Sequence, residues 1–355
     1  MPTMKRFFLL LLCLILTVPA LAQNAPLHAD FEYFEKLGTL IQASTESAAP
    51  SLVSIRITRA APARGARQPR TSEEAGSGIA ATIADKKVIL TNRHVIEEAE
   101  RGSIEILTHD RRPLTLVKTA SNEEYDLAVL EVAEELPRSA RFGNSDKVYV
   151  GEVVLALGNP FGLDRSVSMG VISAVGRRQV PGTAGSAPRT GFFQTDAAIN
   201  PGSSGGMLLN VRGEVIGLVT AIATQGGGNE GVAFAMPINP VLRIAEQLVQ
   251  SETVLKPHIG FGFESVISLE ERRRLKIDRK IGAKIRSVEA GSPADRAGLK
   301  TGDVITMFGE IEVEDGLHII HLVAQSEIDK PIVLQINRNA EIQNITVTPI
   351  AQLSR

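Results

Sequence analysis

The sequence predicts a mainly β protein followed by a smaller α+β unit. From residue 48 to 237, short apolar runs such as 88–90 and 215–219 alternate with turn residues, a spacing typical of β-sandwiches and barrels. Apolar residues at helical spacing then predict a helix over residues 240–251. The composition changes after about His258, which indicates a second unit. The 355 residues, 43% of them hydrophobic, are enough for two packed cores.

The N-terminus has the composition of an export signal. Lys5 and Arg6 precede an apolar run at 7–18, and a small-x-small cleavage site ends at Ala22. We therefore expect residues 1–22 to be a signal peptide that is removed. The alternative is an uncleaved membrane anchor, although the run is shorter than the roughly 20 residues of a spanning helix. Only in that case would the chain contact a membrane.

Composition excludes several classes of function. The formal net charge of −2 gives no electrostatic reason to expect nucleic acid as a partner, and the absence of a Walker motif argues against an ATP-driven machine. The only cysteine, Cys13, lies in the signal run, so disulfides and cysteine-protease chemistry are not expected. His318 and His321 lack clustered cysteine or carboxylate partners, so we expect no metal and no cofactor.

A serine in a glycine-rich turn is the strongest functional signal in the chain. The turn spans residues 199–206 and lies between two apolar runs. Because glycine permits unusual backbone angles, the amides of Gly202, Ser203 and Ser204 could converge on a developing oxyanion. A plain surface turn is the alternative. A nucleophilic Ser204 therefore requires a general base and an orienting carboxylate elsewhere in the chain.

His94 is the candidate base, because it alone among six histidines follows a buried-looking strand and opens a helical turn. Asp126 is the candidate carboxylate, because it directly precedes the apolar strand at 127–132. An ordinary turn role for Asp126 is the alternative, as is Glu123 or Glu124 as the carboxylate. The chain order His94, Asp126, Ser204 is one of the known orders for a serine nucleophile, its base and the residue that orients the base.

At this point the chain resembles the HtrA/Deg serine proteases. The resemblance rests on TNRHV at 91–95, DLAVL at 126–130, LGNPFG at 157–162 and QTDAAINPG at 194–202, and it covers almost all of the chain after the signal. The sequence departs from the family at Ser203, where relatives usually have Asn, and at Met207, where they often have Pro. Ser203 adds a second hydroxyl beside Ser204.

The resemblance implies a chymotrypsin-like double β-barrel, a trypsin-like serine protease domain over residues 48–245, with the catalytic residues between two six-stranded barrels. A linker at 246–257 would follow. Residues 23–47 would form an oligomerisation segment that builds a homotrimer. Its aromatic residues, Phe31, Tyr33 and Phe34, need burial in a chain with 4% aromatic residues, and packing of an amphipathic helix on its own barrel is the alternative.

The same resemblance indicates where substrate would bind. The pocket should lie near Ile199, Thr220, Ala221 and Ile222, all small or apolar side chains. Ala198 stands near the position where an arginine-directed protease places an acid. We therefore expect cleavage after small or medium aliphatic residues.

Residues 258–350 resemble a PDZ domain through GSPA at 291–294 and AGLKTGDVI at 297–305. A PDZ domain binds an extended C-terminal peptide by adding it to a sheet edge. The residues of the expected peptide site are Ile259, Gly260 and Phe261 in a carboxylate-binding loop, with Ile319 and Leu322 as pocket walls on a helix at 317–324. Ordinary core packing is the alternative for Ile259 and Phe261.

Two segments would be regulatory by their position in the family. Residues 177–190 correspond to a loop that senses the PDZ domain, and residues 59–76 to a loop that reaches a neighbouring subunit. Either segment could instead be a solvated loop.

The resemblance as a whole implies an ATP-independent serine endopeptidase of the periplasm. It would process unfolded or damaged proteins through an acyl-enzyme and be regulated by C-terminal peptides at the PDZ domain. One alternative is a signalling protease that cuts a specific membrane protein after PDZ binding. Another is a peptide-binding chaperone without proteolysis.

Overall fold

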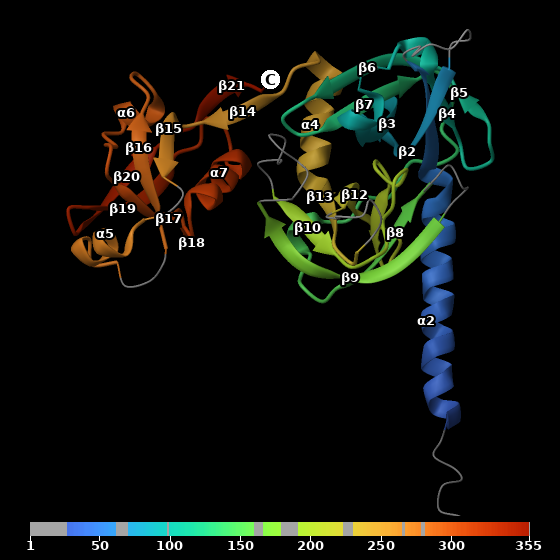
Figure 1. Ribbon diagram of the computed structural model, residues 1–355, viewed down its shortest axis with the longest axis horizontal. Helices are drawn as coiled ribbons and strands as arrows, with labels where there is room; N and C mark the ends of the chain where they lie inside the picture. Colours follow the sequence, from blue (N-terminus) through green and yellow to red (C-terminus); the bar gives the residue numbers. More distant parts are fainter. Residues whose placement is uncertain are drawn as a thin grey trace, which may run out of the picture. The chain divides into compact units, whose positions relative to one another are not determined.

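The computed structural model describes residues 27–61, 70–97, 99–159, 166–178, 191–222, 230–264, 267–277 and 281–354. Strands form most of the regular structure (Figure 1), which confirms the mainly β prediction. The predicted signal peptide at 1–22 lies outside these residues. No helix in the described part of the chain is long and apolar enough to cross a membrane.

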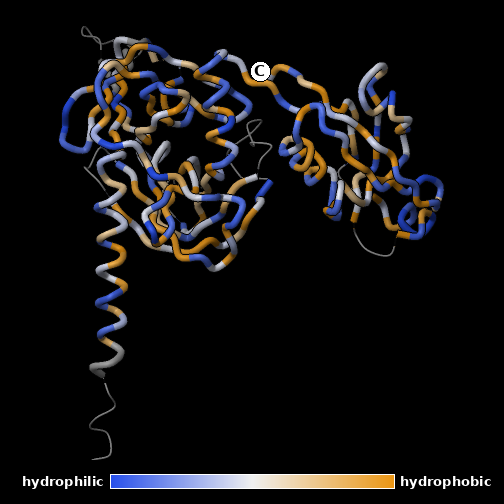
Figure 2. The backbone as a smooth tube through the Cα atoms, turned by 180° about the vertical axis from the view of Figure 1, so that it is seen from behind, coloured by the Kyte–Doolittle hydropathy of each residue, from blue (hydrophilic) through white to orange (hydrophobic). Residues whose placement is uncertain are grey.

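The first helix among the described residues is α2, Leu27–Ala48. Hydrophobic and hydrophilic residues follow one another along it (Figure 2), and the side chains of Phe31, Tyr33 and Phe34 are 57%, 73% and 72% exposed. The chain divides into two compact units, residues 1–43 and 44–355. Within the second unit, the Ser44 hydroxyl donates to the Val211 carbonyl at 2.5 Å and anchors the last turn of the helix. The short helix η1, Ala49–Ser51, follows.

The first sheet has seven strands in the order β5-β4-β1-β2-β3-β7-β6. Their bounds are β1 Leu52–Ala61, β2 Arg70–Ile83, β3 Lys86–Asn92, β4 Ile104–Leu107, β5 Pro113–Leu114, β6 Leu116–Asn122 and β7 Leu127–Val132, with helices α3 Arg93–Ile96 and η2 Arg101–Ser103 between them. Alternate residues of β1, including Val53, Ile55 and Ile57, enter a shared core with β3 and β7. Alternation of this kind is what a half-buried strand requires.

Two details of this sheet differ from expectation. It has a seventh strand, because a tight turn held by Thr108, whose backbone N–H donates to the Arg112 carbonyl at 2.9 Å, folds the two-residue β5 back on β4. The expected loop at 59–76 is also largely strand. Pairs such as Arg59 with Ser72 extend the β1–β2 ladder into it, and residues 62–69 lie outside the described part.

The second sheet is a closed barrel of six strands, as expected, in the order β10-β13-β12-β11-β8-β9. Its strands are β8 Val153–Gly158, β9 Ser166–Arg177, β10 Phe192–Thr195, β11 Met207–Asn210, β12 Val215–Ile222 and β13 Ala233–Pro237, and helix η3, Ser145–Lys147, precedes them. Its core contains Ile172, Phe193, Leu208 and Ile216, each at most 4% exposed. Closure leaves this sheet without an exposed edge.

Helix α4, Ile238–Ser251, lies against strands of both sheets (Figure 1). It buries Val241, Ile244, Ala245 and Leu248 on one face, as the apolar spacing predicted. The helix begins two residues before the predicted Pro240, since proline is tolerated in a first turn. It also occupies the first half of the segment expected to be a linker and ends where Glu252 takes a left-handed conformation.

The C-terminal part of the second unit, from β14 to β21, is called the C-terminal unit here, and it contains an antiparallel sheet with helices. The sheet follows the order β15-β16-β17-β19-β20, and β18 pairs with β17. The elements are β14 Leu255–His258, β15 Phe261–Glu264, α5 Leu269–Arg274, β16 Ala283–Val288, α6 Pro293–Arg296, β17 Val304–Phe308, β18 Ile311–Glu312, α7 Gly316–Gln325, β19 Ile332–Arg338, β20 Glu341–Val347 and β21 Ile350–Leu353. Strands β14 and β21 pair separately. The predicted helix at 317–324 is α7, one residue longer at each end.

Candidate active site

His94 and Asp126 meet where two neighbouring strands end. Strands β3 and β7 are antiparallel and pair Asn92 with Leu127, so the residues just after β3 and just before β7 share one edge. The Nδ1 atom of His94 lies 2.7 Å from Asp126 Oδ2, and the His94 backbone N–H donates to Oδ1 at 2.9 Å. Both carboxylate oxygens therefore hold one residue, which fixes the imidazole ring in position.

The backbone of Asp126 is held as firmly as its side chain. It has a positive φ of 47°, a conformation that aspartate tolerates better than most residues. Its carbonyl accepts hydrogen bonds from the Arg93 N–H at 3.0 Å and from Asn92 Nδ2 at 3.2 Å. The side chain of Asp126 is 15% exposed and that of His94 is 45% exposed. The carboxylate is thus shielded while the imidazole remains accessible.

The two alternative carboxylates have other contacts. Glu124 accepts from Lys256 Nζ at 2.6 Å and from the Ser354 hydroxyl at 2.7 Å. Glu123 is 68% exposed and lies 3.8 Å from Arg93. Asp126 is therefore the carboxylate that the structure brings to His94.

Ser204 lies in the turn between β10 and β11. Its hydroxyl donates to the Thr220 carbonyl at 3.2 Å. Thr220 also contacts the histidine side of the site, because Asn92 Nδ2 donates to its hydroxyl at 3.2 Å. Thr220, which holds the Ser204 hydroxyl, is thus bonded to Asn92, which also donates to the Asp126 carbonyl. The turn and the His94–Asp126 pair are therefore linked through Thr220.

The neighbouring hydroxyl of Ser203 is in a different environment. Ser203 is 7% exposed, and its Oγ lies 3.5 Å from the Asn200 backbone N–H, whereas Ser204 is half-buried. A side chain added at Gly158 would meet Ser203 at about 3.0 Å. Ser203 is therefore packed under the turn, and Ser204 is the more accessible of the two serines.

The amides of the turn fall into two groups. The N–H groups of Ser203, Gly205 and Gly206 donate to the carbonyls of Asn200, Val219 and Ser203, each at 2.9 Å. For Gly202 and Ser204, no partner of the amide appears among the described residues. The structure thus differs from expectation at Ser203, whose amide is used inside the turn. Gly202 and Ser204 retain donors for an oxyanion.

Of the four residues of the expected substrate pocket, the structure describes the side chains of two. Ile199 is 3% exposed and belongs to the core of the second barrel, and Thr220 is 5% exposed with its backbone carbonyl on Ser204. Ala221 and Ile222 lie in β12, and their side chains are not among those described. Ala198 is exposed, and its carbonyl accepts from the Ser168 hydroxyl at 2.7 Å.

Three polar residues of the site were missed by the sequence reasoning. Asn92, Ser77 and Asn159 are 0%, 0% and 3% exposed, and each bonds to groups far away in the chain. Asn92 and Asn159 stand inside the TNRHV and LGNPFG segments. Their position inside those motifs was the one available signal in the sequence. Their partners could not be predicted, although a buried polar residue needs one.

The expected peptide site of the C-terminal unit lies along β15, an edge strand. Gly260 has a φ of +87°, and a side chain there would come within 2.2 Å of Ser292. Ile259, Ile319 and Leu322 are 2%, 0% and 4% exposed and pack in one core cluster, with Phe261 half-buried against it. Four of the five residues thus share one core cluster, as the core-packing alternative for Ile259 and Phe261 requires, and Gly260 lies between those two in the chain.

One ion pair joins the end of β9 to the start of α7. Arg178 pairs with Glu314 and lies 4.0 Å from Asp315. Nearby, the Glu314 N–H donates to His318 Nδ1 at 3.2 Å, and burial together with the positive charge of Arg178 lowers the pKa of His318. The rest of the expected sensor loop, residues 179–190, lies outside the described residues.

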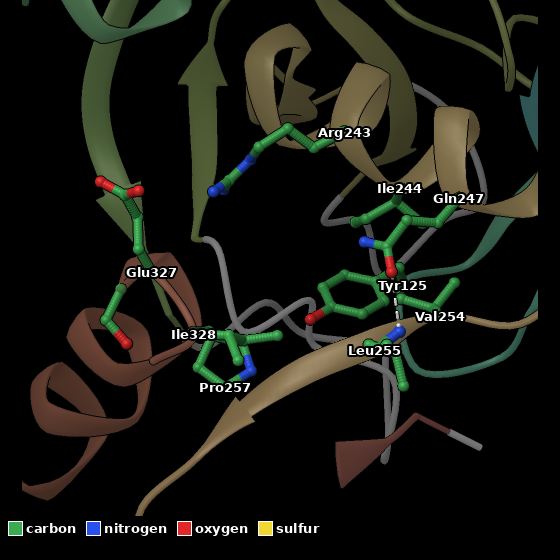
Figure 3. A pocket seen from close by; sticks show the side chains of 11 residues that line it. Tyr125, Arg243, Ile244, Gln247, Val254, Leu255, Pro257, Glu327 and Ile328 are labelled. Atoms are coloured by element: carbon green, nitrogen blue, oxygen red, sulfur yellow. Dashed lines mark hydrogen bonds between the residues drawn. The ribbon is translucent and has the colours of Figure 1, made fainter. Parts of the chain in front are cut away.

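A cavity of about 270 Å³ opens beside Tyr125, the residue before Asp126 (Figure 3). Arg243 of α4 points into it, and Gln247 accepts the Leu255 N–H at 2.8 Å along its side. The other lining residues are Ile244, Val254, Pro257, Ala324, Ser326, Glu327 and Ile328.

Among the described residues there is no cluster of three or more His, Cys, Asp or Glu that could hold a metal ion.

Comparison with known proteins agrees with this architecture. The family model of the trypsin-like peptidase domain matches residues 76–218, and that of the PDZ domain matches residues 257–348. A probable periplasmic serine endoprotease, DegP-like, of Chlamydia pneumoniae is 38% identical over 282 residues, and one of Hahella chejuensis is 36% identical over 287. Each alignment covers 79% of this chain. The chain spans only 56% and 58% of those relatives' lengths.

Solved structures match over a larger share of their own length. The HtrA-type protease AlgW with a tripeptide superposes with a TM-score of 0.70 at 31% identity, covering 88% of this chain and 97% of that one. The serine endoprotease from Yersinia pestis gives 0.58 at 29% identity, covering 88% and 98%. With its trypsin-like peptidase domain and the PDZ domain that follows, the chain belongs to the HtrA-type family of proteases.

Proposed function

We propose that this protein is a serine endopeptidase in which Ser204 is the nucleophile, His94 the general base and acid, and Asp126 the residue that orients His94. The observation that carries the proposal is the double contact of the Asp126 carboxylate with His94, at 2.7 and 2.9 Å. With Nδ1–H donated to Asp126, the neutral imidazole presents Nε2 as an acceptor. That is the tautomer a general base needs.

Attack begins when the Ser204 hydroxyl leaves the Thr220 carbonyl and donates to Nε2 of His94. Oγ then forms a bond to the carbonyl carbon of the scissile peptide while the proton moves to Nε2, and the carbonyl electron pair becomes an oxyanion. Asp126 stabilises the imidazolium that results. Collapse of the tetrahedral species breaks the C–N bond, and Nε2 returns the proton to the leaving amine.

The acyl-enzyme is then hydrolysed by the same groups. His94 takes a proton from water, the hydroxide oxygen attacks the ester carbon, and the proton passes to Ser204 Oγ as the acid product leaves. The amides of Gly202 and Ser204 are the donors available to both oxyanions. In such sites one donor typically contributes about 3–4 kcal/mol of transition-state stabilisation.

We further propose that the substrates are unfolded or damaged proteins of the periplasm. The relatives from Chlamydia pneumoniae and Hahella chejuensis are named periplasmic endoproteases, and the predicted signal peptide at residues 1–22 supports export. No Walker motif is present in the sequence. The test is degradation of denatured casein without ATP by the wild type and by Ser204→Ala. Equal degradation by the two proteins would refute the assignment of Ser204 as the nucleophile.

A signalling role is the second candidate, in which a C-terminal peptide at the PDZ domain switches on cleavage of a membrane protein. AlgW has been solved with a tripeptide and with a decapeptide, which supports peptide binding by this chain as well. The Arg178–Glu314 ion pair supports communication between the PDZ domain and the protease domain. Casein cleavage that rises on adding C-terminal peptides favours this regulation. Cleavage that is independent of peptide favours constitutive quality control.

The assembly we propose is a homotrimer held by α2. Phe31, Tyr33 and Phe34 are more than half exposed in the single chain, which leaves a large apolar surface to be covered. Light scattering after gel filtration measures the mass directly. A monomer at micromolar concentration would contradict the trimer.

Specificity should follow from small and apolar residues near Ile199 and Thr220. No acid stands at Ala198, so we expect cleavage after small or medium aliphatic residues. A peptide-library profile dominated by Lys or Arg at the cleaved position would overturn this expectation.

A further inference from the structure

Ser77 lies at a closely packed point in β2. It is 0% exposed, and glycines flank it on both sides. A side chain at Gly76 would come within 2.4 Å of Val95, and one at Gly78 within 2.4 Å of Ile89. The two glycines therefore let β2 pack closely, and Ser77 is the one residue of this triplet that places a polar side chain there.

All the hydrogen-bonding groups of Ser77 are used, and two of them hold the turn that carries Ser204. The Ser77 hydroxyl donates to the Gly202 carbonyl at 2.8 Å and accepts from the Asn159 N–H at 2.9 Å. Its backbone N–H donates to the Ser204 carbonyl at 2.8 Å. Its carbonyl accepts from the Thr91 hydroxyl at 2.8 Å. Ser77 thus joins a strand of the first sheet to both ends of the Gly202–Ser204 segment.

These bonds fix the directions of the amides in the turn. In a trans peptide the carbonyl and the N–H point in opposite directions. The Gly202–Ser203 peptide is held at its carbonyl by Ser77 and at its N–H by Asn200, so its plane is set from both sides. The next peptide has its carbonyl bonded to the Gly206 N–H, which directs the Ser204 N–H the opposite way.

Glycine makes this constraint necessary. Gly202 has a φ of +94° and no Cβ to restrict it, so the peptide that follows it can rotate at low cost. Rotation of this peptide would exchange the positions of the Gly202 carbonyl and the Ser203 N–H and break their bonds to Ser77 and Asn200. The Gly202 and Ser204 amides on either side of this peptide would then lose their fixed directions.

We infer that the Ser77 hydroxyl is a positioning residue for the oxyanion site, holding the Gly202–Ser203 peptide so that the Gly202 and Ser204 amides face the substrate. The inference rests on the proposed function of Ser204 as nucleophile. Ser77 is fully buried, so it would act on peptide-bond hydrolysis indirectly, by holding the carbonyl of Gly202.

The test is Ser77→Ala in the full chain, with steady-state kinetics on a peptide substrate and binding of a peptide aldehyde, which forms a tetrahedral adduct with Ser204. We expect kcat to fall about 10- to 100-fold while KM changes by less than about threefold, because the loss concerns the transition state. Affinity for the aldehyde should fall in parallel with kcat. Rates are expressed per site titrated with a fluorophosphonate, so unfolded molecules do not contribute.

Ser51→Ala is the matched control. Ser51 is also a buried serine, 1% exposed, whose hydroxyl donates to a backbone carbonyl, that of Ala48 at 2.7 Å, but it lies outside the turn. It should lower thermal stability as a lost buried hydrogen bond does and leave kcat unchanged. A Ser77→Ala variant with wild-type kcat and aldehyde affinity would overturn the inference while leaving Ser204 in place, whereas an inactive wild type would instead refute the proposed function.

Ser77→Cys decides the question if Ser77→Ala does not fold. The thiol keeps the shape of the side chain but is a weak donor, so kcat should again fall with little change in KM. Wild-type kcat in Ser77→Cys would contradict the inference.

Discussion

The hydroxyl of Ser204 donates its hydrogen bond to the backbone carbonyl of Thr220, at 3.2 Å. In the mechanism proposed above, the serine must give up this partner before His94 can take its proton. The Asp126 side chain, in contrast, already holds His94 through both oxygens. In the proposed triad, two of the three residues are thus arranged before substrate binds, and the third requires its hydroxyl to turn from Thr220 toward His94.

Replacing Asp126 with Asn should lower kcat strongly while the fold is kept. An amide in place of the carboxylate cannot accept from both the ring and the backbone N–H of His94, and it does not stabilise the imidazolium. In comparable sites this change costs about 10⁴-fold in kcat. The measurement is kcat on a peptide substrate, with Glu123→Gln as the control on the same turn. Similar rates for the two variants would show that Asp126 does not orient His94.

Asn92→Ala should lower both stability and kcat. The Asn92 side chain is completely buried and donates to the Asp126 carbonyl and to the Thr220 hydroxyl, both at 3.2 Å. Its loss removes two buried hydrogen bonds, each of which typically contributes about 0.5–1.5 kcal/mol, while the Asp126 carbonyl keeps its bond from the Arg93 N–H. Chemical denaturation gives the free energy of unfolding, and the exposed Asn344→Ala should stay within about 0.5 kcal/mol of wild type. Full stability in Asn92→Ala would refute a structural role for these bonds.

His318 should make the α7 region less stable in acid. Its Nδ1 accepts the Glu314 N–H and is therefore unprotonated, and burial, followed by the charge of Arg178, lowers its pKa despite the opposing charges of Glu314 and Asp315. The unfolded chain takes up this proton near the ordinary value of 6.5, and the folded chain does so only at lower pH. The stability that neutral His318 contributes to the folded protein is therefore fully present above pH 6.5 and is lost as the pH falls below that value.

Melting temperatures at several pH values test this prediction. Wild type should lose more stability than His318→Gln between about pH 7 and pH 5, the interval in which histidine titrates. The variant keeps every other histidine, so the difference between the two curves isolates position 318. Parallel curves would contradict the prediction.

Arg338→Met should destabilise the PDZ domain. Arg338 binds both oxygens of Asp303 at 2.7 Å, the Asp303 side chain is 2% exposed, and this contact raises the pKa of Arg338. Removing one partner of a buried pair leaves the other charge uncompensated, at a cost of about 3–5 kcal/mol. The exposed Lys330→Met, which breaks the pair with Glu327, should cost less than about 1 kcal/mol. Equal losses of stability would show that the Asp303 pair is not special.

The sequence was sufficient where chemistry restricts the residue type. A nucleophile, a base and a carboxylate had to be drawn from few candidates, and the chain order of His94, Asp126 and Ser204 reduced them further. The structure brings His94 and Asp126 into contact as that order implied. The strands and α4 were predictable because burial imposes a period on the sequence.

The residues that hold the turn could not be predicted in this way. Ser77 and Gly202 are 125 residues apart, and Asn92 and Thr220 are 128 residues apart. A serine between two glycines is, in sequence, indistinguishable from a surface turn. The use of the Ser203 amide inside the turn depends on the rotation of one peptide plane, and residue types do not determine that rotation.

Labelling with a fluorophosphonate probe tests the central claim most directly. The probe forms a covalent bond with an activated serine, so it should label the wild type and Ser203→Ala at similar rates and leave Ser204→Ala unlabelled. The corresponding loss of peptidase activity in Ser204→Ala should be about 10⁴- to 10⁶-fold. Labelling that survives in Ser204→Ala, or that disappears in Ser203→Ala with the fold intact, would contradict Ser204 as the nucleophile.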